Sequence, residues 1–175
     1  ERAPTPAPAP AGGRVGRAVR TTAKVDYAVR AGVALAVAAA GADGPIEPLK
    51  AHVLAATESI PPKFLESILA DLKRAELVSS QRGAAGGYRL GRPADEITVA
   101  DVIRAVEGPL ADVRGERPET IAYRDGLESL QRMWIAVRAN LRSVLEQTTL
   151  ADLAAGRLDP AVDALADDPD AWDPH

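Results

Sequence analysis

The chain of 175 residues contains no cysteine and only two histidines. The lack of cysteine excludes disulfides, thiolate nucleophiles, cysteine-ligated zinc and iron–sulfur clusters held by cysteine. Aromatic residues are 3% of the chain although hydrophobic residues are 46%, so we expect a helical core of small aliphatic side chains. The longest apolar run, near residues 31–40, is about half as long as a membrane span. These absences predict a cytoplasmic protein without a cofactor.

Catalytic patterns are also scarce. The histidines are His52, inside a predicted helix, and His175, at the end of the chain. Gly83, Gly86 and Gly87 lie between two short predicted strands, whereas a phosphate-binding glycine loop connects a strand to a helix. We therefore expect that the protein is not an enzyme.

Charge is distributed unevenly along the chain, whose net charge is −4. Residues 1–92 carry 13 Lys and Arg against 8 Asp and Glu, a net charge of +5, and residues 93–175 carry 8 against 17, a net charge of −9. A basic half within an acidic protein favours a nucleic-acid partner for the first half.

Residues 60–90 have the pattern of a recognition helix followed by a β-hairpin, here called the wing. Prolines open the helix at 62–75, where a missing N–H costs little, and apolar residues then recur at spacings of three and four. Residues 77–90 predict two short strands around a glycine-rich turn. The predicted apolar face of the helix consists of Phe64, Leu65, Ile68, Leu69 and Leu72.

The opposite face of this helix is small, polar or basic. Lys63, Ser67, Ala70 and Arg74 follow one another at helical spacing, and Arg82 lies beside Gly83 in the predicted turn. Such a face suits the major groove, and an arginine at a wing tip suits a narrow minor groove. The alternative is an ordinary solvated helix and hairpin.

Two further helices are predicted before the recognition helix. The first begins at Thr21 or Thr22, which are good N-caps, and ends at Gly41. After a turn at 43–45, the second follows Ile46, with Pro48 in its first turn, to about Ala56; with the recognition helix it forms a helix-turn-helix. Residues 1–18 are rich in Ala and Pro and predict a disordered extension. The buried stripe predicted for the first helix is Val25, Ala28, Val29, Gly32, Val33 and Ala36.

The second half predicts a dimerisation region. Thr98 caps a helix ended by Gly108, residues 109–122 form a polar loop, and a long helix runs from about 123 to 148. Its apolar seam predicts pairing with a twin helix; the alternative is packing against its own domain. The tail after 153 is acidic and expected to be flexible. The seam consists of Leu127, Leu130, Trp134, Val137, Leu141 and Val144.

In order along the chain, residues 22–31, 60–72, 77–90 and 97–153 resemble the Rrf2 family of bacterial transcription regulators, most specifically in the wing. The resemblance implies a mostly α fold with a small β-wing: a winged helix-turn-helix domain over 19–92 and a dimerisation region over 93–153. It also implies a homodimeric regulator on a pseudo-palindromic operator of double-stranded DNA. We expect it to act as a repressor, although the sequence does not distinguish a repressor from an activator. The alternative is an interaction module that regulates a partner protein through the long helix.

Carried over by position, the resemblance places Lys24 and Tyr27 near the DNA backbone. It places Lys63, Glu66 and Ser67 on the turn that contacts bases, where Glu66 can accept a hydrogen bond from a cytosine amino group. Arg82 falls at the wing tip.

Two departures from the family pattern are visible. Glu76 stands where a glycine usually separates the recognition helix from the wing. Many members hold an iron–sulfur cluster with three cysteines in the loop matching 109–122, and this chain has none. Asp26 matches a carboxylate ligand of some members, and we expect it to cap the helix or form a salt bridge instead. A small-molecule or protein effector could use the 109–122 loop, with Arg114 and Arg117 as anion contacts.

Overall fold

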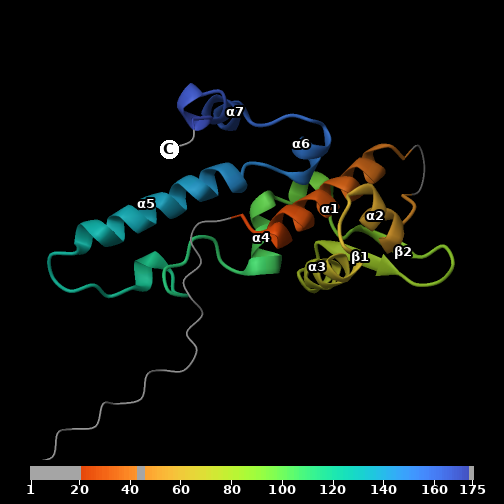
Figure 1. The fold of residues 1–175 in the computed structure, drawn as a ribbon, viewed down its shortest axis with the longest axis horizontal. Helices are drawn as coiled ribbons and strands as arrows, with labels where there is room; N and C mark the ends of the chain where they lie inside the picture. The colour runs from red at the N-terminus through yellow and green to blue at the C-terminus, as the bar shows by residue number, and fades with distance from the viewer. Residues whose placement is uncertain (1–20, 43–45, 174–175) are drawn as a thin grey trace, which may run out of the picture.

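Helices dominate the computed structural model, which describes residues 21–42 and 46–173 (Figure 1). The predicted extension at 1–18 and turn at 43–45 lie outside the described residues. In chain order the elements are α1 (Ala23–Ala40), α2 (Ala51–Thr57), α3 (Pro62–Arg74), β1 (Val78–Gln81), β2 (Gly87–Leu90), η1 (Ala94–Glu96), α4 (Val99–Glu107), η2 (Pro118–Thr120), α5 (Glu128–Leu145), α6 (Leu150–Ala154), α7 (Pro160–Ala166) and η3 (Pro169–Ala171).

Helix α1 lies at the centre of the core and packs against α3, α4 and α6. The Thr22 side chain accepts a hydrogen bond from the Val25 N–H, which caps the helix as the sequence predicted. Gly32 permits close approach of α6, because a Cβ at this position would lie 3.0 Å from Leu150 Cδ1. The end of the chain therefore returns to the first helix. The buried stripe of α1 is Val25, Ala28, Ala31, Gly32, Leu35 and Ala36.

Helix α2 is shorter than predicted. Its first residue is Ala51, and Pro48 precedes the helix instead of lying in its first turn. The reason is a long-range pairing: Leu49 and Tyr88 exchange two backbone hydrogen bonds, each 2.8 Å from N to O. Residues ahead of α2 thus extend the edge of the wing, which ties the helix-turn-helix to β2.

The wing is an antiparallel pair in which Val78 lies opposite Leu90 and Gln81 opposite Gly87. Gly83 has φ +103°, in the left-handed region that favours glycine. A Cβ at Gly86 would lie 2.4 Å from the Gln81 carbonyl oxygen, so the turn needs a glycine there. The predicted hairpin is confirmed.

The second half contains α4, capped by Thr98 and Asp101 as a capping box. Helix α5 starts at Glu128, about five residues later than predicted, because 123–127 form a turn-rich approach.

The acidic tail was expected to be flexible, but α7 and η3 form there, with side-chain caps from Asp159 and Asp168. Within the described residues, no helix has both the length and the hydropathy of a membrane span.

Candidate nucleic-acid interface

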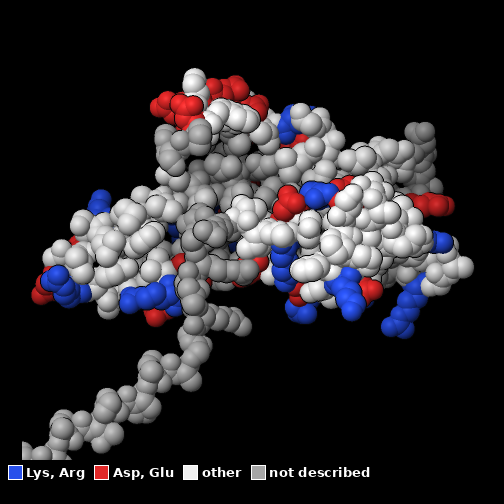
Figure 2. All heavy atoms as spheres, viewed as in Figure 1, with Lys and Arg blue, Asp and Glu red and all other residues white. Residues whose placement is uncertain are grey.

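Helix α3 presents an outward face beside the wing. Leu65, Ile68, Leu69 and Leu72 are buried, so the core fixes which side of α3 reaches solvent. Lys63, Glu66, Ser67 and Arg74 are all exposed. Lys and Arg side chains project from the edge of the molecule that carries α3 and the wing, whereas acidic side chains gather over α7 on the opposite side (Figure 2). This arrangement can contact phosphates and base edges together.

Phe64 was placed on the apolar face of this helix, but the structure corrects that placement. Phe64 is 55% exposed, because position 64 lies at the edge of the buried face formed by Leu65, Ile68, Leu69 and Leu72. There it meets Tyr27 edge to face, with ring centroids 6.3 Å apart. The guanidinium of Arg30 lies 5.8 Å from the centroid of the Tyr27 ring. Tyr27 therefore connects α1 to α3.

Lys24 was expected to lie near the DNA backbone, but its ammonium group has internal partners. Its Nζ donates to Asp71 Oδ2 at 2.7 Å and to the Val106 carbonyl oxygen at 2.9 Å. The hydrogen bond from Lys24, aided by Arg74, lowers the pKa of the Asp71 carboxyl below its usual value. Lys24 thus joins α1, α3 and α4, and these two bonds use two of the three N–H donors of its ammonium group.

Arg74 also bonds to Asp71, with 2.9 Å between Nη1 and Oδ1. Its side chain nevertheless remains 75% exposed, so it stays accessible on the outward face. Within the part of the chain that the structure describes, neither Lys63 nor Arg82 pairs with a carboxylate. Their positive charges are available to a polyanion.

The wing is anchored to α3 by a residue that sequence reasoning missed. Lys73 Nζ donates to Ser80 Oγ at 2.7 Å, and Arg89 Nε donates to Ser79 Oγ at 3.3 Å across the pair of strands. Arg82 and Gly83 lie exposed at the tip, beyond these anchors. The three polar residues that follow Val78 in β1 could have indicated that the end of this strand is exposed, but not its contact with Lys73.

Helix α5 projects from the rest of the fold (Figure 1), and none of its residues is buried. The seam residues predicted for dimerisation are all half-buried, and Met133 and Ile135 are exposed. Leu127 is the N-cap residue of the helix. A continuous half-exposed apolar face of this length suits pairing with another helix.

The 109–122 segment packs along part of α5. Gln131 Nε2 donates to the carbonyl oxygens of Pro118 and Ile121 at 3.1 and 3.0 Å. Arg138 Nη1 lies 2.5 Å from Glu119 Oε2, and its hydrogen bond lowers the pKa of that carboxyl. Packing against its own chain, the alternative for this helix, therefore applies to part of its surface, and at its C-terminal end Arg104 of α4 also pairs with Glu146. Arg114 and Arg117 are exposed.

Iron–sulfur chemistry does not fit the donors present. The chain has no cysteine, and the described residues contain no group of three His, Asp or Glu side chains that could hold a metal ion. Asp26 forms an ion pair with Arg30, with 3.3 Å between Oδ2 and Nη1, which confirms the salt bridge expected for it.

A helix-turn-helix followed by a two-stranded wing and a projecting helix defines the winged helix-turn-helix class of DNA-binding proteins. Residues 21–156 match the family model Rrf2, described as an iron-dependent transcriptional regulator. The chain belongs to the Rrf2 family of transcriptional regulators, and it is not an enzyme. The winged-helix fold and the family expected from the sequence are thereby confirmed.

Relatives and solved structures agree with this assignment. A Mycobacterium tuberculosis protein, Rv1287, named as a candidate HTH-type transcriptional regulator, is 49% identical over 150 residues, covering 86% of this chain and 90% of the relative. The structure of CymR, titled the global cysteine regulator of B. subtilis, matches with TM-score 0.65 and 32% identity, covering 79% of this chain and 98% of that one. T. potens IscR matches with TM-score 0.58 and 27% identity, covering 90% and 93%.

Proposed function

We propose that this protein is a cytoplasmic, homodimeric repressor that holds no iron–sulfur cluster. It binds a pseudo-palindromic operator of double-stranded DNA. The observation that carries the proposal is the juxtaposition of two exposed cationic elements. Helix α3 offers the exposed residues Lys63, Ser67 and Arg74, and the wing, whose strand β1 packs against α3, offers the exposed Arg82 at its tip. A helix can enter the major groove while the wing reaches the adjacent minor groove.

Each exposed residue has a proposed role that follows from its chemistry. Lys63 and Arg74 contact phosphate or guanine, Ser67 contacts a base edge, and Glu66 accepts from a cytosine amino group. Arg82 and Gly83 allow the wing tip to approach the minor groove. Tyr27 and Lys24 act chiefly by holding α1 against α3, which fixes the angle at which the helix enters the groove.

A twofold axis through α5 supplies the symmetry of the operator. The seam from Leu127 to Val144 remains half-exposed in the single chain, and pairing would remove this apolar surface from water. Dimers of helix-turn-helix proteins bind two half-sites about one helical turn apart. The dimer therefore sets the spacing of the two recognition helices.

A charged effector would act at the 109–122 segment. This segment connects α4 to α5 and is fixed to α5 by Gln131 and Arg138. Arg114 and Arg117 are exposed on it and provide contacts for an anionic molecule or an acidic surface of a protein.

The decisive experiment is selection of bound sequences from a pool of random DNA duplexes, followed by gel shifts on the selected site. The proposal predicts an enriched inverted repeat and a complex containing two protomers. Charge reversal of Lys63 and Arg74 together should abolish the shift. If no sequence is enriched and the chain instead captures a protein through α5, the alternative of an interaction module replaces DNA binding.

A further inference from the structure

A cavity of about 550 Å³ lies between α1, α2 and α6, away from the outward face of α3. This volume falls in the range of small-molecule sites. Of the twelve lining residues, nine are aliphatic and three are polar. None of the described residues that line the cavity is aromatic, so its walls suit a flexible aliphatic chain rather than a stacked ring.

The apolar wall includes a second stripe on α1, whose residues Val29 and Val33 are only partly buried at the edge of the core. Val29, Val33 and Val37 follow at intervals of four residues, beside the stripe that faces α3 and α4. Val37 is 51% exposed, and Val53 across the cavity is also exposed. Exposed apolar residues gathered around a concave surface mark a binding site more often than isolated ones do.

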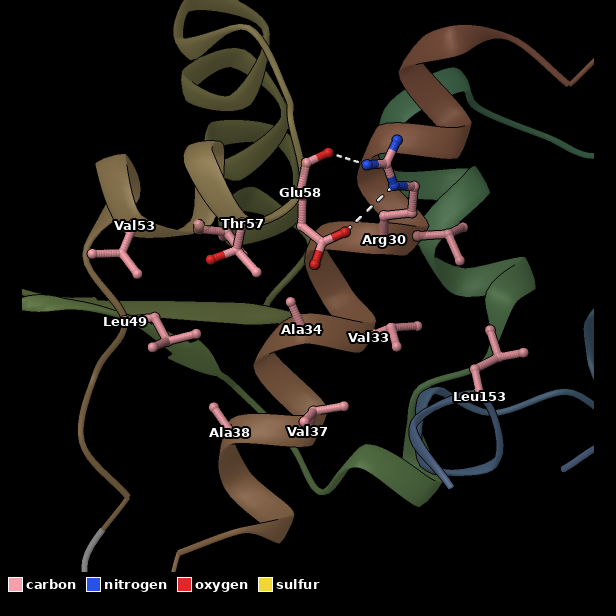
Figure 3. A pocket seen from close by; sticks show the side chains of 12 residues that line it. Arg30, Val33, Ala34, Val37, Ala38, Leu49, Val53, Thr57, Glu58 and Leu153 are labelled. Atoms are coloured by element: carbon pink, nitrogen blue, oxygen red, sulfur yellow. Dashed lines mark hydrogen bonds and ion pairs between the residues drawn. The ribbon is translucent and has the colours of Figure 1, made fainter. Parts of the chain in front are cut away.

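One end of the cavity is polar, as Figure 3 shows. Arg30 donates from Nε to Glu58 Oε2 at 3.4 Å and from Nη2 to the Glu58 carbonyl oxygen, while Nη1 lies 3.3 Å from Asp26 Oδ2. The guanidinium is thus surrounded by two carboxylates, and the three groups together carry one negative charge. The Thr57 hydroxyl lies on the same side (Figure 3).

We propose that this cavity binds an aliphatic molecule whose polar head donates hydrogen bonds, such as an alcohol or an amine. The alkyl chain lies against the α1 valines, Leu49 and Val53, and the head faces Glu58 and Thr57. A carboxylate head is disfavoured, because Arg30 is already neutralised and the surrounding charge is negative.

The position of the cavity gives the ligand a route to the recognition helix. Leu54 of α2 lines the cavity and is buried in the core, and the α2–α3 turn is fixed by the Ile60 N–H bond to Ala55. Leu153, on the opposite wall, belongs to α6, which follows the dimerisation helix. A molecule wedged here would shift α2 against α1 and so change operator affinity, an effect that rests on the proposed DNA-binding function.

The test compares three probes that share one chain length: octanol, octylamine and octanoate. Binding to the full chain is measured by calorimetry without DNA, so that its failure would leave the proposed DNA binding intact. We expect octanol and octylamine to bind at least tenfold more tightly than octanoate. Ala34→Leu and Ala38→Leu, which place added methyl groups in the cavity, should each weaken binding at least tenfold. The Ala161→Leu variant, exposed on α7, serves as the matched control and should bind as the unsubstituted chain does.

Thermal melting of each variant confirms that it folds, and Glu58→Gln provides an independent check of the polar end. Removal of that negative charge should reduce the difference in binding affinity between octylamine and octanoate. Absence of binding by all three probes would overturn the proposal, as would binding that both filling variants leave unchanged. If the two filling variants change the number of protomers in the assembly but leave probe binding unchanged, the cavity belongs to a subunit contact instead. Tighter binding of octanoate than of octylamine would overturn the assignment of the head.

Discussion

Glu76 has the left-handed backbone that this position requires, with φ +59°. A side chain in this conformation costs about 1–2 kcal/mol, whereas glycine adopts it freely. Glu76→Gly should therefore raise the free energy of unfolding, by about 0.5–1 kcal/mol after the greater entropy of the unfolded glycine chain is subtracted. The measurement is the urea midpoint at constant slope.

The neighbouring residue supplies a control for that variant. Ala75 has φ −85°, which any residue adopts, so Ala75→Gly should lower the free energy of unfolding. If both glycine variants destabilise, the left-handed backbone of Glu76 carries no cost and its side chain contributes a contact of its own.

The bond between Lys24 and Asp71 predicts a dependence of stability on pH. The pKa of Asp71 is lowered in the folded state, chiefly by the hydrogen bond from Lys24. The unfolded state therefore binds the proton more tightly, and the bond contributes stability that is present above the usual carboxyl pKa of 3.8 and is lost as the pH falls toward the folded value.

Lys24→Met should accordingly reduce the stability at neutral pH, by about 1–2 kcal/mol, and should flatten the loss of stability as the pH falls below the usual carboxyl value of 3.8. Urea unfolding from neutral pH to below that value measures both effects. Lys63→Met, an exposed residue on the same side, is the matched control and should change neither. Unchanged stability together with a uniformly weaker, less salt-dependent DNA affinity would instead restore Lys24 to the phosphate contacts.

At the scale of elements, the wing and α3 should make separable contributions to DNA binding. Arg82 lies at the wing tip, so Arg82→Ala should weaken specific binding by about 1–3 kcal/mol and relax the preference at minor-groove positions. Binding to the selected operator and to scrambled DNA across a salt series provides the measurement. Arg124→Ala, in the approach to α5, removes an equal charge far from this surface and serves as control. If Arg82→Ala lowers the affinity for the operator and for scrambled DNA equally, the wing contacts only the DNA phosphate backbone.

At the scale of the whole molecule, dimerisation should depend on the α5 seam. Trp134→Glu would place a charge in the paired apolar surface, which is costly without a partner. We expect monomers by sedimentation at micromolar concentration and a large loss of operator affinity. Ala139→Glu adds the same charge on the exposed opposite side of α5 and should remain dimeric. A Trp134→Glu variant that still sediments as a dimer would place the subunit contact elsewhere.

The protein should also function without iron, because no cysteine is available to hold a cluster. Purified protein should be colourless and contain no stoichiometric iron by elemental analysis. Its operator affinity should be equal with and without chelator, and with and without oxygen. Iron at one cluster per protomer would show that ligands other than cysteine suffice.

The sequence by itself determined the features that depend on neighbouring residues. Threonine caps at Thr22 and Thr98, the glycine turn of the wing and the helical spacing of leucines in α3 each act within a few positions, so they were predicted correctly. The positive charge of the first half and the absence of cysteine are properties of composition. The caps, the glycine turn and the leucine spacing together were enough to indicate a winged helix and the exposed face of α3.

Tertiary structure decided what depends on contacts between distant segments. The pairing of Leu49 with Tyr88 delays the start of α2, and α1 brings Tyr27 to Phe64 and Lys24 to Asp71. The return of α6 onto Gly32 completes one wall of the cavity. The spacing of Val29, Val33 and Val37 was visible in the sequence, but a half-buried stripe cannot be distinguished from a core stripe until its neighbours are placed. The periodicity of a helix fixes which side chains share a face, and only packing fixes what that face meets.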